Sequence, residues 1–366
     1  MVAMVKTSDG REHYNDAKLL SHNAVWNWCI GARGLGKSYA AKTRLCRNAI
    51  KNGSEGIYLR RTVEEQKKKE TFFTDIASQF PDISFRVNGS VGEYHRDGDV
   101  METSKGDVKE RWRTVCYFHS LSQAGHLKSV PYPKVTFIFF DEIFPMNGRY
   151  LPDEATQFSE YYSTIDRYQD RTRVFFAANA LSTANPYFAR YGVDVTAQQA
   201  ARQDIKTYDD GFIAVELADY RGFSVSVAQS RFGRFITNFD PSYAAYAIGN
   251  EFKDAGDNLV FPLERAQCYY SWTLCTPDYG EFHLWITITK DDETLFIISR
   301  RHTRERMALT FDAHMVTPDC TMVNKGSPQI KALLRAYQNG RLRFDNTQVR
   351  NECMQVLGAI IGGTSR

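Results

Sequence analysis

The feature that most constrains this chain is the octapeptide GARGLGKS at residues 31–38, which directly follows an apolar run. It matches G-x-x-x-x-G-K-[ST] at every required position, and its flanks predict a buried strand over 24–30 and a helix over 38–50. The glycines let backbone N–H groups approach phosphate oxygens closely, and the helix adds its positive N-terminal dipole. The pattern therefore predicts a phosphate-binding loop in an α/β unit, rather than an ordinary glycine turn.

The residues of this loop have separate predicted roles. Lys37 is expected to reach the terminal phosphates of ATP, and the Ser38 hydroxyl to bind the accompanying Mg²⁺. Arg33 either contacts its own nucleotide or reaches a neighbouring subunit, and a solvent-facing loop tip is the alternative. The full nucleotide-binding set predicted from the sequence is Gly31, Ala32, Arg33, Gly34, Leu35, Gly36, Lys37, Ser38, Tyr39 and Asn179.

A second motif supplies acids to the same site. Residues 134–143, KVTFIFFDEI, predict a buried strand that ends in two carboxylates. At the carboxyl edge of a parallel sheet, Asp141 is expected to serve Mg²⁺ together with Ser38, and Glu142 to polarise the attacking water. Two solvated acids at a strand end are the alternative. Because the second acid favours hydrolysis over phosphoryl transfer to a small substrate, the sequence predicts an ATPase that uses ATP and Mg²⁺.

Asn179 ends another apolar stretch, RTRVFFAAN, and either senses the γ-phosphate or simply caps the strand. Three arginines precede or begin that stretch: Arg167, Arg171 and Arg173. A ring-forming ATPase needs an arginine that is offered to the neighbour's nucleotide. Position alone does not choose among the three.

The pattern of the whole chain predicts two domains, because 366 residues exceed the usual size of one. Apolar strands alternate with helices up to residue 204, including helices over 62–80 and 152–168, which predicts a parallel sheet covered on both faces. The region 205–257 begins as a polar, helix-prone segment and is expected to be a connector. Residues 258–366 predict hairpin-joined strands followed by C-terminal helices.

Composition narrows the possible functions. The net charge of +3 means that any nucleic-acid contact depends on local basic patches. The seven cysteines are scattered and form no CxxC pair, which favours reduced thiols in a cytosol over disulfides or a zinc site. No apolar run is long enough to span a bilayer or to act as a signal peptide, so no membrane partner is expected.

Five stretches carry a resemblance to a known family: IGARGLGKSYAAK, FFDEI, ANALSTANPYF, SRFGRF and YQNGRLRFDNTQVRN. They resemble the DNA-packaging ATPases of small short-tailed bacteriophages (Picovirinae, Bacillus phage phi twenty-nine type). The resemblance implies an ASCE-type P-loop ATPase domain over 1–204, a linker over 205–257 and an RNase H-like domain over 258–366. It also implies a homopentameric ring that drives double-stranded DNA into a procapsid, contacting the portal and a packaging RNA in the cytoplasm of the infected host.

Carried over residue by residue, the resemblance makes 31–38 the Walker A loop, with Lys37, Asp141 and Glu142 catalytic. Arg167 falls at the family's trans-acting arginine finger, and Lys128 where the family has a lysine beside the central channel. Two departures stand out. Residues 91–113 are longer than the family pattern, so pore-facing residues there cannot be transferred. Val63 replaces a family lysine, whose role either moved to one of Lys67, Lys68 and Lys69 or is absent.

The C-terminal domain leaves a choice of functions. An RNase H-like nuclease needs an aspartate on its first strand, but the expected first strand, 267–275, contains no acid. We therefore predict an inactive nuclease, and the alternative function is a terminase-like protein that also cuts DNA. A third alternative is a P-loop switch that binds nucleotide without turnover, against which Glu142 argues. The DNA-binding candidates of this domain, or else a solvated helix face, are Lys331, Arg335, Arg341 and Arg343.

Overall fold

The computed structural model describes residues 4–6, 12–104, 106–127, 130–145, 150–180, 185–240, 244, 259–261, 263, 268–288, 294–301, 303–304 and 307–361. The chain divides into two compact units. The larger unit comprises Met1–Leu181 with Ala197–Lys253, and the smaller comprises Ser182–Thr196 with Asp254–Arg366. No helix in the described part of the chain is long and apolar enough to cross a membrane. All seven cysteines are free thiols.

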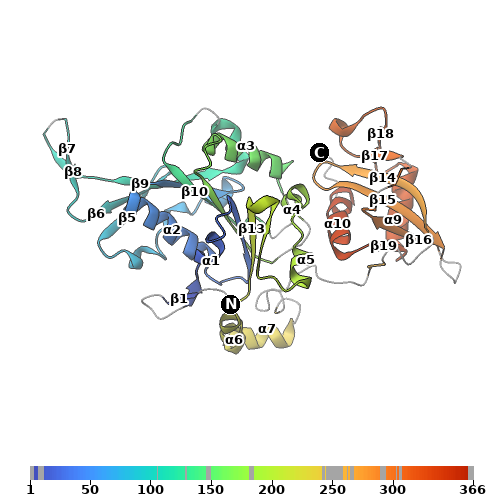
Figure 1. The fold of residues 1–366 in the computed structure, drawn as a ribbon, viewed down its shortest axis with the longest axis horizontal. Helices are drawn as coiled ribbons and strands as arrows, with labels where there is room; N and C mark the ends of the chain where they lie inside the picture. The colour runs from blue at the N-terminus through green and yellow to red at the C-terminus, as the bar shows by residue number, and fades with distance from the viewer. Residues whose placement is uncertain are drawn as a thin grey trace. The chain divides into compact units, whose positions relative to one another are not determined.

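The larger unit is built on a sheet to which the described residues contribute nine strands (Figure 1). In spatial order they are β12 (Ile205–Tyr208), β13 (Ile213–Ala218), β3 (Trp26–Gly31), β11 (Arg173–Ala178), β10 (Val135–Asp141), β4 (Glu55–Arg60), β9 (Arg113–Ser120), β6 (Val91–Arg96) and β5 (Ile83–Asn88). The six strands from β13 to β9 are parallel, and antiparallel pairs flank them at both ends. β11 thus lies between the strand that precedes the phosphate loop and the strand that ends in the acids.

Helices cover both faces of this sheet, which explains why its central strands are apolar throughout. Phe139 and Phe175 belong to the core on the side of helix α2 (Lys37–Asn52), which also contains Leu45. The next residues along the same strands, Phe140 and Phe176, contact Phe158 of helix α3 (Glu154–Asp166) on the other side. Other elements of this unit are β1 (Met4–Lys6), β2 (Glu12–Tyr14), α1 (Ala17–Leu20), η4 (Leu121–Leu127), η5 (Asp209–Gly211), α6 (Arg221–Gln229) and α7 (Arg231–Phe239). Helix α5 (Val195–Ala200) crosses the boundary between the units.

Two sequence-based expectations are wrong. The segment 62–80 is not an α-helix but a series of short 3-10 turns: η1 (Glu64–Gln66), η2 (Lys69–Thr71) and η3 (Ala77–Gln79). These turns bring Phe72, Phe73 and Ile76 into the core, where tertiary packing overrides local helix propensity. Residues 205–218 are not a helical connector, because they form β12 and β13, and β13 pairs with β3 at the phosphate loop.

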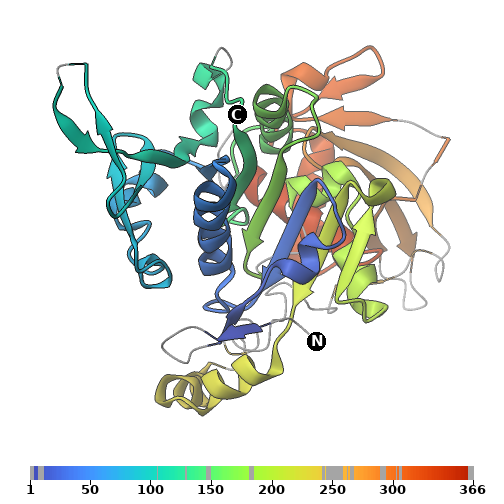
Figure 2. The same cartoon turned by 60° about the vertical axis from the view of Figure 1, so that its left-hand side comes forward.

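A two-stranded arm extends from strands β6 and β9 (Figures 1 and 2). It consists of β7 (Val100–Glu102) and β8 (Val108–Glu110), which pair only with each other among the described strands. Helices α6 and α7 follow β13 at the other end of the sheet order, and both views place them far from the arm.

In the smaller unit the described residues form a six-stranded sheet. Its strands in spatial order are β18 (Cys320–Met322), β17 (Ala308–Thr310), β14 (Tyr269–Thr276), β15 (Gly280–Ile288), β16 (Thr294–Ser299) and β19 (Leu342–Phe344). β14, β15 and β16 are antiparallel, whereas β17 and β18 extend the sheet in parallel from β14. Its other elements are α4 (Pro186–Tyr191), η7 (Ala313–Met315), α9 (Pro328–Gln338) and α10 (Thr347–Ile361).

The NPYF motif of the sequence belongs to this smaller unit. Asn185 caps α4 by accepting a hydrogen bond from the Phe188 N–H at 2.9 Å, and Pro186 occupies the first helical position. Ala189 of the same helix packs against the core of α9, α10 and the sheet. A segment that precedes β12 in the chain therefore completes the C-terminal core.

Candidate active site

The loop between β3 and α2 has a backbone that only glycines adopt without strain. Gly34 and Gly36 have φ values of +84° and +94°, in the left-handed region. A Cβ on Gly31 would lie 2.8 Å from the Ala218 carbonyl oxygen, so this position also requires glycine. The loop thereby turns from the strand into α2 and places the helix N-terminus at a cavity.

Lys37 is held at this loop with its ammonium group directed toward oxygen atoms. Its Nζ donates to the carbonyl oxygens of Gly31 and Ala32, each at 2.7 Å, and to Asn179 Oδ1 at 3.2 Å. Burial lowers the pKa of this ammonium to about 8. The three acceptors of its hydrogen bonds are neutral, and the nearby Asp141 carboxylate partly opposes the effect of burial on the pKa of Lys37.

Asp141 joins the acidic strand to the phosphate loop. Ser38 Oγ donates to its Oδ1 at 2.9 Å, while Tyr58 Oη and Arg60 Nη1 contact its Oδ2 at 3.1 Å and 3.3 Å. Burial raises the pKa of Asp141, and the charge of Arg60 and the Ser38 hydrogen bond oppose that shift. A hydroxyl beside a carboxylate is an oxygen donor set that suits Mg²⁺, so these residues fit the predicted metal.

Glu142 follows Asp141 but has a different environment. Its backbone has a φ of +55°, which is uncommon for a residue with a side chain, and its side chain is 59 % exposed. Its Oε2 accepts a hydrogen bond from Arg60 Nη2 at 2.7 Å. The carboxylate that the sequence predicts as the base is therefore held by a cation in this structure.

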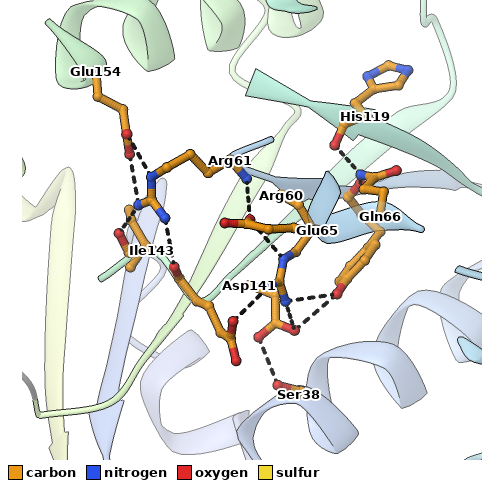
Figure 3. A network of polar contacts seen from close by, with 11 residues as sticks. Ser38, Arg60, Arg61, Glu65, Gln66, His119, Asp141, Ile143 and Glu154 are labelled. Carbon is orange, nitrogen blue, oxygen red and sulfur yellow. Dashed lines mark hydrogen bonds and ion pairs between the residues drawn. The ribbon is translucent and has the colours of Figure 1, made fainter. Parts of the chain in front are cut away.

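Two consecutive arginines at the end of β4 have different roles: Arg60 contacts the acids of the site, and Arg61 supports the backbone that carries them (Figure 3). Arg60 binds both Asp141 and Glu142. Arg61 points the other way, to the buried carboxylate of Glu154, at 2.7 Å and 3.0 Å. Arg61 also donates to the carbonyl oxygens of Glu142 and Ile143, so it fixes the backbone that carries the two acids.

These groups surround a cavity of 580 Å³, which is large enough for a nucleotide. Of the predicted nucleotide set, residues 33–39 and Asn179 line it, together with Asp141 and Glu142. Gly31 and Ala32 do not line the cavity, although their carbonyl oxygens hold Lys37.

A further part of the cavity lining comes from the segment that follows β4, which contains no recognisable motif. Four polar residues of that segment line the cavity: Thr74, Asp75, Ser78 and Gln79. Asp75 pairs with Lys42 of α2 at 3.0 Å, which attaches this wall to the helix of the phosphate loop. The sequence pattern missed these lining residues because it predicts an α-helix over 62–80. The 3-10 turns that replace this helix orient the four side chains differently. Val63, Lys67, Lys68 and Lys69 do not line the cavity.

The three arginines near β11 are in unlike environments. Arg171 donates to the carbonyl oxygens of Tyr132, Pro133 and Ile165, so it joins backbone segments. Arg173 contacts Asn23 Oδ1 at 3.2 Å at the start of β11, the strand end opposite Asn179.

Arg167 is exposed and lies at the C-terminal end of α3 with a φ of +53°. The Asp166 carboxylate accepts hydrogen bonds from the backbone N–H groups of the four residues 169–172. Burial alone would raise the pKa of Asp166, but these hydrogen bonds lower it below its ordinary value. The Asp166 carboxylate therefore fixes the turn that follows Arg167. Of the three arginines, Arg167 is the exposed one.

The predicted DNA contacts are only partly visible. Lys128 lies outside the described residues. Lys331 and Arg335 are exposed one turn apart on α9, and Arg341 is exposed after that helix. Arg343 is half-buried on β19, where it donates to the carbonyl oxygens of Gly340 and Leu342.

The chain is similar to known proteins in both sequence and structure. The profile of the family described as "Podovirus DNA encapsidation protein (Gp16)" matches residues 8–359. The DNA packaging proteins of Bacillus phages phi29 and PZA are each 30 % identical over 344 residues, covering 92 % of this chain and 95 % of theirs. A chain of the bacteriophage Phi-29 viral genome packaging motor assembly superposes with a TM-score of 0.68 at 28 % identity, covering 95 % of this chain and 99 % of that one.

Proposed function

Because this chain belongs to the family of podovirus DNA encapsidation proteins and acts in viral DNA packaging, we propose that it hydrolyses ATP with Mg²⁺ to drive double-stranded DNA into a procapsid. The observation that carries this proposal is the convergence of Lys37, Ser38, Asp141 and Glu142 on one cavity. The predicted family is confirmed by the matching profile. The hydrolysis, its residues and its partners are the proposal.

The sheet order supports an ASCE-type ATPase. β11 lies between β3 and β10, so Asn179 at its end reaches the space between the phosphate loop and the acids. An amide there is placed to sense the γ-phosphate, because it already contacts the lysine that would bind it. We propose that residues 33–39 and Asn179 bind the nucleotide, and that the carbonyl oxygens of Gly31 and Ala32 orient Lys37.

The chemistry follows from the contacts of each group. Bound Mg²⁺ would neutralise charge that develops on the phosphoryl oxygens, and Ser38 and Asp141 are the residues that would hold it. Lys37 would exchange its carbonyl acceptors for phosphate oxygens. Glu142 would have to leave Arg60 to accept a proton from water, so Arg60 holds the base away from the reaction until the site rearranges.

We propose that Arg167 acts in trans, in a homopentameric ring at the portal vertex. Its support is the exposed, pinned turn at the end of α3, whereas Arg171 and Arg173 are bound to their own chain. Arg33 stays a second candidate for contact in trans because it is exposed, whereas its place in the lining of its own cavity favours contact with its own nucleotide. Contact with the portal and with a packaging RNA, in the cytoplasm of the infected host, belongs to the same proposal.

We propose that the C-terminal unit is an RNase H-like domain without nuclease activity. Three antiparallel strands extended by two parallel ones, in the order β16-β15-β14-β17-β18, support the fold. The engagement of its acids within the unit supports inactivity: half-buried Asp345 accepts hydrogen bonds from Ser299 and Leu263, and buried Glu352 pairs with Arg300. Lys331, Arg335, Arg341 and Arg343, together with Lys128, stay the candidate DNA contacts.

The test is ATP hydrolysis by the full chain with and without double-stranded DNA, paired with native mass measurement. We expect DNA to stimulate hydrolysis strongly, and rings to appear with nucleotide or procapsids. Hydrolysis that ignores DNA would contradict the motor. Mg²⁺- or Mn²⁺-dependent cleavage of a plasmid by the full chain would instead favour the terminase-like alternative.

A further inference from the structure

The arm formed by β7 and β8 has two unlike faces. The register pairs Val100 with Glu110 and Glu102 with Val108, so these four side chains share one face. Val100 and Val108 are 51 % and 67 % exposed, and both strands are exposed throughout. The other face carries the opposed pair Met101 and Lys109. One side of the arm therefore presents two valines beside two carboxylates to solvent.

Contacts at its base give the arm a defined direction. Arg113 pairs with Asp99 at 2.7 Å, and the Arg111 N–H donates to the Asp99 carbonyl oxygen at 2.9 Å. The guanidinium of Arg86, on β5, stacks over Trp112 at 3.9 Å from the ring centroid. The arm is thus an extension of the sheet that is braced from β5 and from its own first turn.

The charge of the arm argues against a nucleic-acid partner. Residues 100–110 contain three acids and two lysines, and the charged residues that the two strands carry on the face with the valines are both acids, Glu102 and Glu110. A phosphate backbone is bound by lysines and arginines and repelled by such a segment. The arm is suited instead to an apolar surface that carries positive charge.

Helices α6 and α7 provide such a surface on the same chain. Phe232, Phe235 and Phe239 follow one another at helical spacing on α7 and are 63 %, 56 % and 75 % exposed. Arg231 and Arg234 are exposed beside them. Residues 221–239 contain three arginines and no acid.

The packing of α7 against α6 directs the phenylalanines outward. A Cβ on Gly233 would lie 1.9 Å from the Val227 carbonyl oxygen, so only glycine allows α7 to approach α6 this closely. Ile236 turns inward against Val227 and Ala228. The aromatic face therefore points away from the helix pair rather than into its small core.

We infer that the arm of one copy docks on the α6–α7 face of a second copy, with Val100 and Val108 against the phenylalanines and Glu102 and Glu110 against Arg231 and Arg234. The charges of the two surfaces are opposite, and both are apolar at the centre. Both views place the arm and α6–α7 far apart within one unit (Figures 1 and 2). The contact is therefore heterologous, and such contacts build rings or filaments by head-to-tail repetition.

This contact would adjoin the nucleotide loop. Phe223 of α6 lies with its Cζ 3.5 Å from the position that a Cβ on Gly34 would take. The helix pair that receives the neighbour's arm thus also touches the phosphate loop of its own chain.

A charge exchange between the two surfaces tests the inference. The full chain is compared with the arm variant Glu102→Arg/Glu110→Arg, the helix variant Arg231→Glu/Arg234→Glu, and the combination of all four changes. Sedimentation velocity, both without nucleotide and with ADP, measures self-association. We expect each variant alone to weaken association about tenfold or more, and the combination to restore it, because like charges then become opposite again. Lys109→Glu, on the other face of the arm, is the matched control and should change association little.

Several results would overturn the inference. These are a wild-type chain that stays monomeric at about 100 µM, single-surface variants that associate like the wild type, and a combined variant that associates no better than either. If the helix variant instead loses binding to a DNA duplex or an RNA hairpin while its association is unchanged, α7 is a nucleic-acid surface. The inference does not rest on hydrolysis, so a chain that associates but does not hydrolyse ATP would contradict the proposed function alone.

Discussion

The acids at the two sheets of this protein have opposite surroundings. In the larger unit, Asp141 and Glu142 line a 580 Å³ cavity and share one arginine, Arg60, with Glu142 largely exposed. In the smaller unit, Asp345 is bound by Ser299 Oγ at 2.7 Å and by the Leu263 N–H at 3.0 Å. Glu352 there is bound by Arg300 and by Gln348. Both units carry carboxylates at a sheet, and of these four described acids Asp141 and Glu142 are the ones that line the 580 Å³ cavity.

The partners of an acid, rather than its presence, therefore separate a reactive site from a structural one. Asp345 follows β19 and connects it to two other segments of its unit, because its carboxylate accepts hydrogen bonds from Ser299 of β16 and from residue 263. Asp141 keeps a hydroxyl and a cavity on one side. Removing the charge of Asp141 and removing that of Asp345 should therefore have different consequences for ATP hydrolysis.

The largest effect is expected from Asp141→Asn. Removing this charge should lower the rate of ATP hydrolysis about 1,000-fold, because it removes a carboxylate from the position where Mg²⁺ is to be held. Asp345→Asn is the matched change in the other unit, and its hydrolysis without DNA should equal that of the wild type. Steady-state phosphate release measures both. Equal losses in the two variants would remove the distinction between the sheets.

The next effect separates the neighbouring arginines by stability. Arg61→Met should lower the free energy of unfolding by about 3–5 kcal/mol, because it removes the cation that balances the charge of the buried Glu154 carboxylate. Arg60→Met removes a partner of the exposed Glu142 as well as one of Asp141, and should cost less stability while changing hydrolysis. Urea unfolding followed by fluorescence measures the difference. A more destabilising change at Arg60 would show that the support is assigned to the wrong arginine.

The third effect is a pH dependence that Lys37 introduces. Its pKa is about 8 in the folded chain against 10.5 ordinarily, so the unfolded chain binds more protons between these values. The free energy of unfolding should therefore rise with pH above 8, by about 1 kcal/mol between pH 7 and pH 9. Over the same range nucleotide binding should weaken as the ammonium loses its proton.

Lys37→Met should lack the pH-dependent gain in stability, whereas Lys51→Met, at an exposed position at the end of α2, should retain it. Urea titrations at several pH values compare the three chains. A wild-type stability that falls above pH 8 in step with Lys37→Met would contradict a depressed pKa at this lysine.

The smallest effect is expected at the surface of the smaller unit. Lys331→Ala/Arg335→Ala should weaken binding to double-stranded DNA a few-fold and reduce the slope of log affinity against log salt by about 2. Hydrolysis without DNA should be unchanged. Fluorescence anisotropy across a salt series measures the slope. An unchanged slope would leave this face of α9 as a solvated helix surface.

The sequence predicted the site better than it predicted the walls of the site. The phosphate loop and the acidic strand are predictable from local patterns, because each motif is a short run of residues with a fixed spacing. Asn179 was proposed for the site because the strand ends of a parallel sheet meet at one edge, and its side chain lines the cavity. By contrast, Thr74 and Gln79 line the cavity only because 3-10 turns replace the helix that local propensity favours.

The same reasoning explains the error at residues 205–218. The stretch FIAVELA reads as helix or strand, because a short apolar run has no decisive period. Its pairing with β3 is a non-local contact across more than 180 residues, which no window of sequence contains. Arg60 was missed for a similar reason, since its role is set by acids more than 80 residues away.

The role of Glu142 as the base is tested by comparing ATP binding with ATP hydrolysis in Glu142→Gln, in the presence of double-stranded DNA. The account predicts that this variant binds ATP about as well as the wild type, because the phosphate loop, Lys37 and Ser38 are untouched. It predicts that hydrolysis falls about 100-fold to 10,000-fold, because the amide cannot accept the proton of the attacking water. Hydrolysis that continues at the wild-type rate would contradict the account, because Glu142 would then not be the base.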